Sequence, residues 1–179
     1  MNFTLHTPTQ APTAALALLE GVQKAYGFVP NLMGQMAEAP AALQGYLALG
    51  QAFGQSSLSA VERQVVMMTI NRLADCGYCM AAHCVVASME GMPAEVLSAL
   101  RAGRALPDTR LDALRQFTER MHNSRGHSSA QDLAALLTAG YSRQTALEVI
   151  TGVGLKLISN YAAHLMQPPL DAAFQAQAW

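Results

Sequence analysis

The sequence predicts an all-α fold, in which helices pack into an oligomeric multihelical bundle. Ten Met residues and many Ala stand against only 6% aromatic residues, a composition that favours packed helices over a β-sandwich. Apolar residues recur at helical spacing almost throughout, and no run alternates convincingly at strand period. The chain has 179 residues, of which 51% are hydrophobic and 13% are charged. We therefore expect one domain over residues 1–179, with part of its apolar surface buried between subunits.

The first predicted helices are bounded by glycine and proline. Thr13–Tyr26 ends at Gly27, a residue type that commonly stops a helix. A short segment opens at Pro30 and runs to residue 37. Pro40 then starts the next helix, which is expected to reach about Phe53.

A capping box opens the predicted core helix. Ser59 is the expected N-cap, with Glu62 three residues further on. The residues that follow, up to Leu73, leave little polar surface, so this helix is expected in the core. Asp75 is the expected N-cap of the next helix, which holds all three cysteines and ends near Gly91. The remaining helices are predicted over Pro93–Ala102, Asp108–His122, Ser129–Ala139 and Ser142–Ala163.

Charge and hydropathy argue against several classes of partner. Eleven basic residues face twelve acidic ones, a net charge of -1, whereas surfaces that bind nucleic acid carry a basic excess. No apolar run is long enough to span a membrane, and the stretch Ala146–Ile158 is interrupted by Lys156. The first residues lack the basic start and apolar run of a secretory signal, so a cytoplasmic location is expected. Cysteines in that compartment serve redox or metal chemistry more often than structural disulfides.

Three cysteines and a histidine fall in the short segment Asp75–Cys84. On a helix, Cys76, Cys79 and His83 lie within an arc of about 60°, and Cys79 and His83 stand one turn apart. Such a dithiol can attack a substrate, oxidise and close a disulfide, with His83 as the base or charge partner that lowers a thiol pKa. Cys84 points about 80–100° away from this arc and is expected to lie outside the chemistry.

Two other interpretations remain open from the residues alone. Cys76 and Cys79 could bind zinc together with Cys84 or a remote histidine, although no second CxxC or HxxxH supplies the usual distant ligand pair. The thiols could also be inert, packed as small hydrophobes, or act as a redox sensor in a non-enzymatic helical oligomer. No haem attachment is expected, because Met80 stands where that motif has its histidine.

The CxxC-x3-H segment resembles the alkylhydroperoxidase D-like (AhpD-like) branch of the carboxymuconolactone decarboxylase family. The preceding helix, beginning LSAVERQVV, the upstream segment GFVPNLMGQMAEAPAALQGYLAL and the later NYAAHLMQPPLD are similar to the same family, in the same order. The resemblance covers most of residues 25–171 and implies an all-α fold assembled as dimers, trimers or hexamers. Decarboxylase members lack the cysteine pair, so its presence favours the peroxidase-like branch.

That resemblance implies roles for individual residues. Cys79 would be the peroxidatic thiol, Cys76 the resolving thiol that closes a redox-active disulfide with it, and His83 the base of a proton relay. Studied members carry a glutamate twelve residues before the first cysteine, where this chain has Gln64. A glutamine can orient His83 by hydrogen bonding but cannot accept a proton at neutral pH. The substitution puts the efficiency of a peroxidase in question.

The resemblance implies a thiol-dependent peroxidase, of the alkyl hydroperoxide reductase type, that needs no cofactor and no metal. Its substrates would be a small hydroperoxide and a thiol or lipoyl-type reductant, and it would act as a homo-oligomer. A late helical segment is similar to one that can approach the site of the family. It contributes the further candidates Asn160, Tyr161 and His164, of which His164 is the candidate catalytic residue.

Overall fold

The all-α fold predicted from the sequence is confirmed. A computed structural model describes residues 3–179, which form nine α-helices and one C-terminal 3-10 helix, with no strand in this part of the chain. The helices are α1 (Thr13–Tyr26), α2 (Asn31–Met36), α3 (Pro40–Gly54), α4 (Ala60–Leu73), α5 (Gly77–Met89), α6 (Ala94–Ala102), α7 (Thr109–Asn123), α8 (Ala130–Thr138), α9 (Arg143–Met166) and η1 (Ala172–Gln177).

Three helices start at a serine cap, and the cap at Ser59 is the one that the sequence predicted. Ser59, Ser129 and Ser142 each accept a hydrogen bond from the backbone N–H three residues on, and the side chain of that third residue bonds back to the serine N–H. Each capping box satisfies backbone donors that the first turn of a helix leaves unpaired. The boundaries are therefore fixed locally, and they agree with the predicted ones to within a few residues.

The predicted N-cap at Asp75 is wrong, because Cys76 is the N-cap of α5. Asp75 instead ends α4: it has φ of 52°, its N–H donates to Arg72 O at 3.2 Å, and the Cys76 N–H donates to Asn71 O at 3.0 Å. These two bonds form a Schellman motif, with aspartate in the left-handed position that glycine usually occupies. The connection between α4 and α5 is consequently very short and holds Cys76 at its centre.

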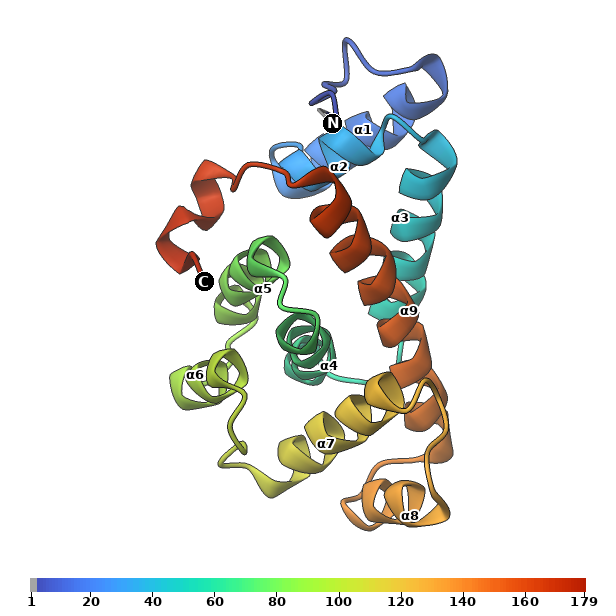
Figure 1. Cartoon of the computed structure of the whole chain (residues 1–179), viewed down its shortest axis with the longest axis vertical. Coiled ribbons are helices and arrows are strands. Elements are labelled where there is room, and N and C mark those ends of the chain that lie inside the picture. Colours follow the sequence, from blue (N-terminus) through green and yellow to red (C-terminus); the bar gives the residue numbers. More distant parts are fainter. Residues whose placement is uncertain (1–2) are drawn as a thin grey trace.

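Helix α4 lies at the centre of the bundle, in contact with α5, α6, α7 and α9 (Figure 1). Its apolar side chains anchor the larger of two buried clusters. The second cluster lies between α1, α2, α3, the start of α5 and the end of α9, and it includes Cys76 and Cys79. The two cysteines thus sit in apolar surroundings at the junction of five helices.

The chain beyond α9 crosses to α5, as Figure 1 shows. The Asp171 carboxylate accepts hydrogen bonds from the Asn31 N–H, at 3.0 Å, and from the Tyr78 hydroxyl. Phe174 packs edge-on against Tyr78, with ring centroids 6.1 Å apart. Tyr78 stands between the two cysteines in sequence, so the C-terminal segment holds the first turn of α5 in place.

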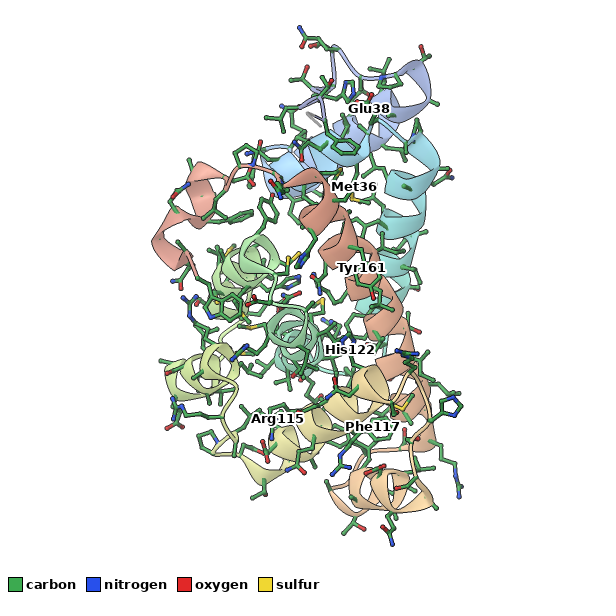
Figure 2. All side chains as sticks on the ribbon, viewed as in Figure 1. Met36, Glu38, Arg115, Phe117, His122 and Tyr161 are labelled. Carbon is green, nitrogen blue, oxygen red and sulfur yellow. The ribbon has the colours of Figure 1, made fainter. Side chains whose placement is uncertain are left out.

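An apolar strip stays exposed along α9. Leu147, Ile150, Tyr161 and Leu165 are all exposed and share one side of the helix. Tyr161 is labelled on α9 in Figure 2. The homo-oligomer stays a prediction, which light scattering on the purified protein will measure. Among residues 3–179 no helix is both long and apolar enough to cross a bilayer.

Two glycines of α9 provide a matched test of its packing. A Cβ atom at Gly152 would lie 2.8 Å from Val66 Cγ1 and 2.9 Å from Phe53 Cζ, whereas one at Gly154 would meet nothing within 4 Å. Gly152→Ala is expected to lower the free energy of unfolding by about 1–3 kcal/mol through overpacking. Gly154→Ala is expected to raise it by up to about 1 kcal/mol through helix propensity. Urea denaturation measures both, and equal effects would contradict the close approach of α9 to α4.

Candidate active site

Two of the three thiols lie together at the start of α5. Cys76 caps the helix and Cys79 lies in its first turn, and both side chains are buried, with 3% and 2% of their surface exposed. Cys84 belongs instead to the larger apolar cluster, where Arg101 Nη1 lies 3.1 Å from its sulfur. All three are free thiols. The structure therefore separates Cys84 from the other two, as the helical spacing predicted.

His83, which is half-buried, is the middle member of a hydrogen-bonded chain that also includes the buried side chains of Gln64 and Lys156. Its Nδ1 lies 2.8 Å from Gln64 Oε1, and its Nε2 lies 3.0 Å from Lys156 Nζ. An amide oxygen only accepts and an ammonium group only donates, so the imidazole carries its proton on Nδ1 and accepts at Nε2. Burial lowers the pKa of His83 well below its usual value, and the charge of Lys156 lowers it further. His83 is consequently neutral at pH 7, with both nitrogens occupied.

This arrangement differs from the one that the sequence suggested for His83. The spacing of one helical turn indicated Cys79 as the direct partner of the imidazole. In the structure the nitrogen that could accept a proton is bonded to Lys156 instead. Lys156, from α9, therefore takes the place beside the thiols that was expected for the histidine.

The pKa values of the two neighbouring thiols are shifted in opposite directions. The pKa of Cys79 is lowered to about 6, first by a hydrogen bond from the Cys76 thiol and then by Lys156, Ser159 and His164, which together outweigh the effect of burial. The pKa of Cys76 is raised, because its proton is held in the hydrogen bond to Cys79 and because the side chain is buried. At neutral pH the pair is thus a thiolate at Cys79 with a thiol donor at Cys76.

A cavity of about 630 Å³ on the side of α1 and α3 reaches the His83 end of this site, and neither Cys76 nor Cys79 lines it. His83 and Gln64 line it, together with Tyr46 and apolar side chains such as Met33, Leu47 and Met67. Burial, followed by the charge of Cys79, raises the pKa of Tyr46, which is one of the residues that line the cavity. A second hollow of about 670 Å³, beside His122 and Tyr161 (Figure 2), is lined by neither of the two cysteines nor by His83. Of the residues that the sequence proposed for the site, it contains Tyr161.

Residues 37–119, which hold Cys76, Cys79, His83 and Gln64, match the sequence profile of the Carboxymuconolactone decarboxylase family. The chain is similar to this family over that segment, and the crystal structures described next share its AhpD-like fold. No curated protein sequence matches the chain.

Crystal structures with an AhpD-like fold are similar to this chain over nearly their whole length. One is the alkylhydroperoxidase AhpD core, an uncharacterized peroxidase-related protein from Ralstonia eutropha JMP134, with TM-score 0.86 and 19% identity over 97% of this chain and 93% of that one. An uncharacterized peroxidase-related protein from Silicibacter sp. TM1040 has TM-score 0.83 and 21% identity, over 99% and 94%. The debrominase Bmp8, as its C82A variant with 2,3,4-tribromopyrrole, has TM-score 0.77 and 19% identity, over 97% and 95%.

Helix α9 supplies groups of the site that lie outside the matched family segment. Lys156, Ser159 and Asn160 are buried on one face of α9, while His164 is exposed. Lys156 was missed as a site residue, because its only visible signal was that it interrupts an apolar run. Its spacing of one turn from Asn160 within a buried helix face was the available clue.

The carboxylate nearest in sequence to the relay position is engaged elsewhere. Glu62 accepts from the Ser59 N–H at 2.8 Å and forms an ion pair with Arg110. Glu62 is therefore not available to His83, whose partner is Gln64 at 2.8 Å. Among residues 3–179, no three His, Cys, Asp or Glu side chains come together in a set that could hold a metal ion.

Proposed function

We propose that this AhpD-like protein is a thiol peroxidase, which reduces an organic hydroperoxide with Cys79 as the attacking group and Cys76 as the resolving group. The observation that supports the proposal best is the lowered pKa of Cys79 beside a Cys76 thiol that keeps its proton. A thiolate is the reactive form of cysteine, and a neighbouring thiol can close the disulfide.

The reaction balances with these two sulfur atoms alone. The Cys79 thiolate attacks the terminal oxygen of the hydroperoxide, so that an S–O bond forms and the O–O bond breaks. Sulfur supplies the electron pair and becomes a sulfenic acid, while the alkoxide leaves and takes up a proton. The Cys76 sulfur then attacks Cys79, forming a disulfide and releasing water. A dithiol reductant restores both thiols and is itself oxidised to a disulfide.

In this mechanism Lys156 is the charged group and His83 is a positioning residue. The positive charge of Lys156 favours the thiolate, and His83 holds the Lys156 ammonium by accepting its hydrogen bond. Gln64 fixes the imidazole by accepting from Nδ1–H. A neutral glutamine suits this role, because a glutamate would favour a protonated His83 that could no longer accept from Lys156. The change at position 64 is thus compatible with activity.

The cavity beside His83 and Tyr46 supports a substrate with an apolar body. Its volume of about 630 Å³ lies in the range of small-molecule pockets, and most of its lining is apolar. Hydrogen peroxide has no apolar group to fill such a space. We therefore expect an alkyl or aryl hydroperoxide as the better substrate, and a small thiol or a lipoyl-type dithiol as the reductant.

Mass spectrometry of the intact protein after brief treatment with tert-butyl hydroperoxide tests the proposal. The wild type is expected to lose two hydrogens as the Cys76–Cys79 disulfide forms, and a dithiol should reverse the change. Peptide mapping should place the bond between these two cysteines and leave Cys84 free. A wild type that keeps its mass under peroxide would contradict the peroxidase, and would favour inert thiols.

The fold shared with the debrominase Bmp8 supports a second candidate for the same thiolate. Cys79 would attack the bromine of an aryl bromide, the ring carbon would take up a proton, and Cys76 would displace bromide to give the same disulfide. The intact-mass experiment with 2,3,4-tribromopyrrole in place of peroxide separates the two. A disulfide that forms with 2,3,4-tribromopyrrole but not with the hydroperoxide would favour debromination.

A further inference from the structure

Asn160 is completely buried, yet neither polar atom of its side chain has a hydrogen-bond partner among residues 3–179. Buried side-chain amides in native proteins almost always have a partner, in the protein or in a bound molecule. Because the protein supplies none for Asn160, its Nδ2 and Oδ1 are free to bind a molecule that enters the site.

The position of Asn160 on α9 places it beside Cys79. Lys156 lies one turn before it and His164 one turn after it, on the same side of the helix. Lys156 Nζ lies 3.0 Å from His83, which is one turn after Cys79 on α5, and Ala163 of α9 packs in the same apolar cluster as Cys79. The charges of Lys156 and His164 and a hydrogen bond from Ser159 also lower the pKa of Cys79. Asn160 is therefore in the middle of the helix face that covers the thiolate.

A second buried amide near the same cysteine has an unused atom. Asn71 Nδ2 donates to Cys79 O at 3.1 Å, while its Oδ1 has no partner within the described chain. Asn71 lies on α4 and Asn160 on α9, so helices on two sides of Cys79 each present unpaired polar atoms. Polar groups left unpaired around a nucleophile suit a small polar molecule or group bound there.

We propose that Asn160 Nδ2 binds the leaving oxygen of the hydroperoxide while Cys79 attacks the terminal oxygen. The proposal rests on the peroxidase function proposed above. As the O–O bond breaks, the electron pair from sulfur leaves negative charge on the alkoxide oxygen. An amide N–H already in place stabilises that charge without having to reorganise. Lys156, one turn away, gives the alkoxide its proton, so that an alcohol leaves, and regains one from water.

This role differs from that of the groups that make the thiolate. Cys76, Lys156, Ser159 and His164 are the groups that lower the pKa of Cys79. The Asn160 amide carries no charge, and its effect is directed at the oxygen that leaves. Losing it should slow a reaction that expels an alkoxide and leave unchanged a reaction of the same thiolate that expels iodide.

The test compares these two reactions in Asn160→Leu, which replaces the amide by an apolar group of similar size. At pH 7, the rate constant for oxidation of Cys79 by tert-butyl hydroperoxide is expected to fall about 100-fold, as on loss of one oxyanion donor. The rate constant for alkylation of Cys79 by iodoacetamide is expected to stay at the wild-type value. Asn160→Ser keeps a hydroxyl donor, so its rate constant for oxidation should fall less than that of Asn160→Leu. This variant also tests the proposal if Asn160→Leu fails to fold.

A series of aryl hydroperoxides with different leaving-group pKa values shows how the oxidation rate depends on the leaving group. A packing defect at position 160 would not change that dependence. Oxidation of Asn160→Leu should depend more steeply on the leaving-group pKa than oxidation of the wild type. Asn123→Leu, at the exposed end of α7, is the matched control and should match the wild type. Equal losses of oxidation and alkylation, or an unchanged oxidation rate, would overturn the role of Asn160. A wild type that peroxide does not oxidise would overturn the peroxidase as well.

Discussion

Replacing Lys156 with methionine is expected to raise the pKa of Cys79 and to slow its alkylation by iodoacetamide about tenfold at pH 7. The hydrogen bond from Cys76 is the first cause of the lowered pKa, and it would remain. The positive charge of Lys156 is the largest of the other lowering causes. Without it, burial acts on the thiolate with less opposition, and the thiol form is favoured.

The pH dependence of the alkylation rate shows the direction in which the pKa of Cys79 has moved. With its pKa lowered to about 6, Cys79 of the wild type should keep its alkylation rate down to about that pH and lose it only below. A pKa raised to about 8 would leave about a tenth of the thiolate at pH 7. The midpoint for Lys156→Met should therefore move to higher pH, and the two rates should converge in alkaline solution, where both proteins carry the thiolate.

Lys24 provides the control, because it is the only other lysine of the chain and lies exposed in the last turn of α1. Lys24→Met should have the same alkylation midpoint as the wild type. Lys156→Arg retains a positive charge, so its midpoint should lie at lower pH than that of Lys156→Met. Removing a buried charge is not expected to destabilise the fold, since a methionine of similar length fills the same space. Identical midpoints in the wild type and Lys156→Met would show that the charge of Lys156 does not set the acidity of Cys79.

The helices could be predicted because their ends are set by neighbouring residues. Ser59 and Ser142 cap helices through side chains only three residues apart, so the signal is complete within a short window. Asp75 shows where this reasoning fails. An aspartate after one helix and before another can end the first or cap the second, and here the short connection uses it to end α4. The choice depends on how α4 and α5 pack.

Only the part of the site that lies within one short helical segment could be predicted from the sequence. The spacing of Cys76, Cys79 and His83 along α5 brought these groups to one region, and the predicted hydrogen bond from His83 to Gln64 is present at 2.8 Å. Lys156 contacts His83 from a position 73 residues away along the chain. No local pattern encodes that contact, because it depends on α9 packing against α4 and α5. A buried lysine in an apolar helix is nevertheless costly enough that its position alone marks it for attention.

Cys79→Ser is expected to abolish peroxide reduction, whereas Cys76→Ser should still react once and stop at a sulfenic acid on Cys79. Cys79 carries the low pKa, and it lies within the influence of Lys156, Ser159 and His164. In Cys76→Ser, dimedone should trap the sulfenic acid at Cys79, since the resolving thiol is gone. A serine hydroxyl can still donate to the Cys79 thiolate, so the first step should survive, although more slowly than in the wild type.

In Cys79→Ser, Cys76 remains a buried thiol, and burial alone keeps its pKa raised even without the thiolate beside it. Dimedone should therefore label it slowly or not at all. Cys84 is an internal control in both variants, because burial raises its pKa too and Arg101 only partly offsets this. Quantitative peptide mapping after a fixed peroxide exposure measures all three positions at once. If Cys76 in Cys79→Ser is labelled as fast as Cys79 in Cys76→Ser, the position of Cys76 at the N-terminus of α5 activates it as well as Lys156 activates Cys79, and the two roles are reversed.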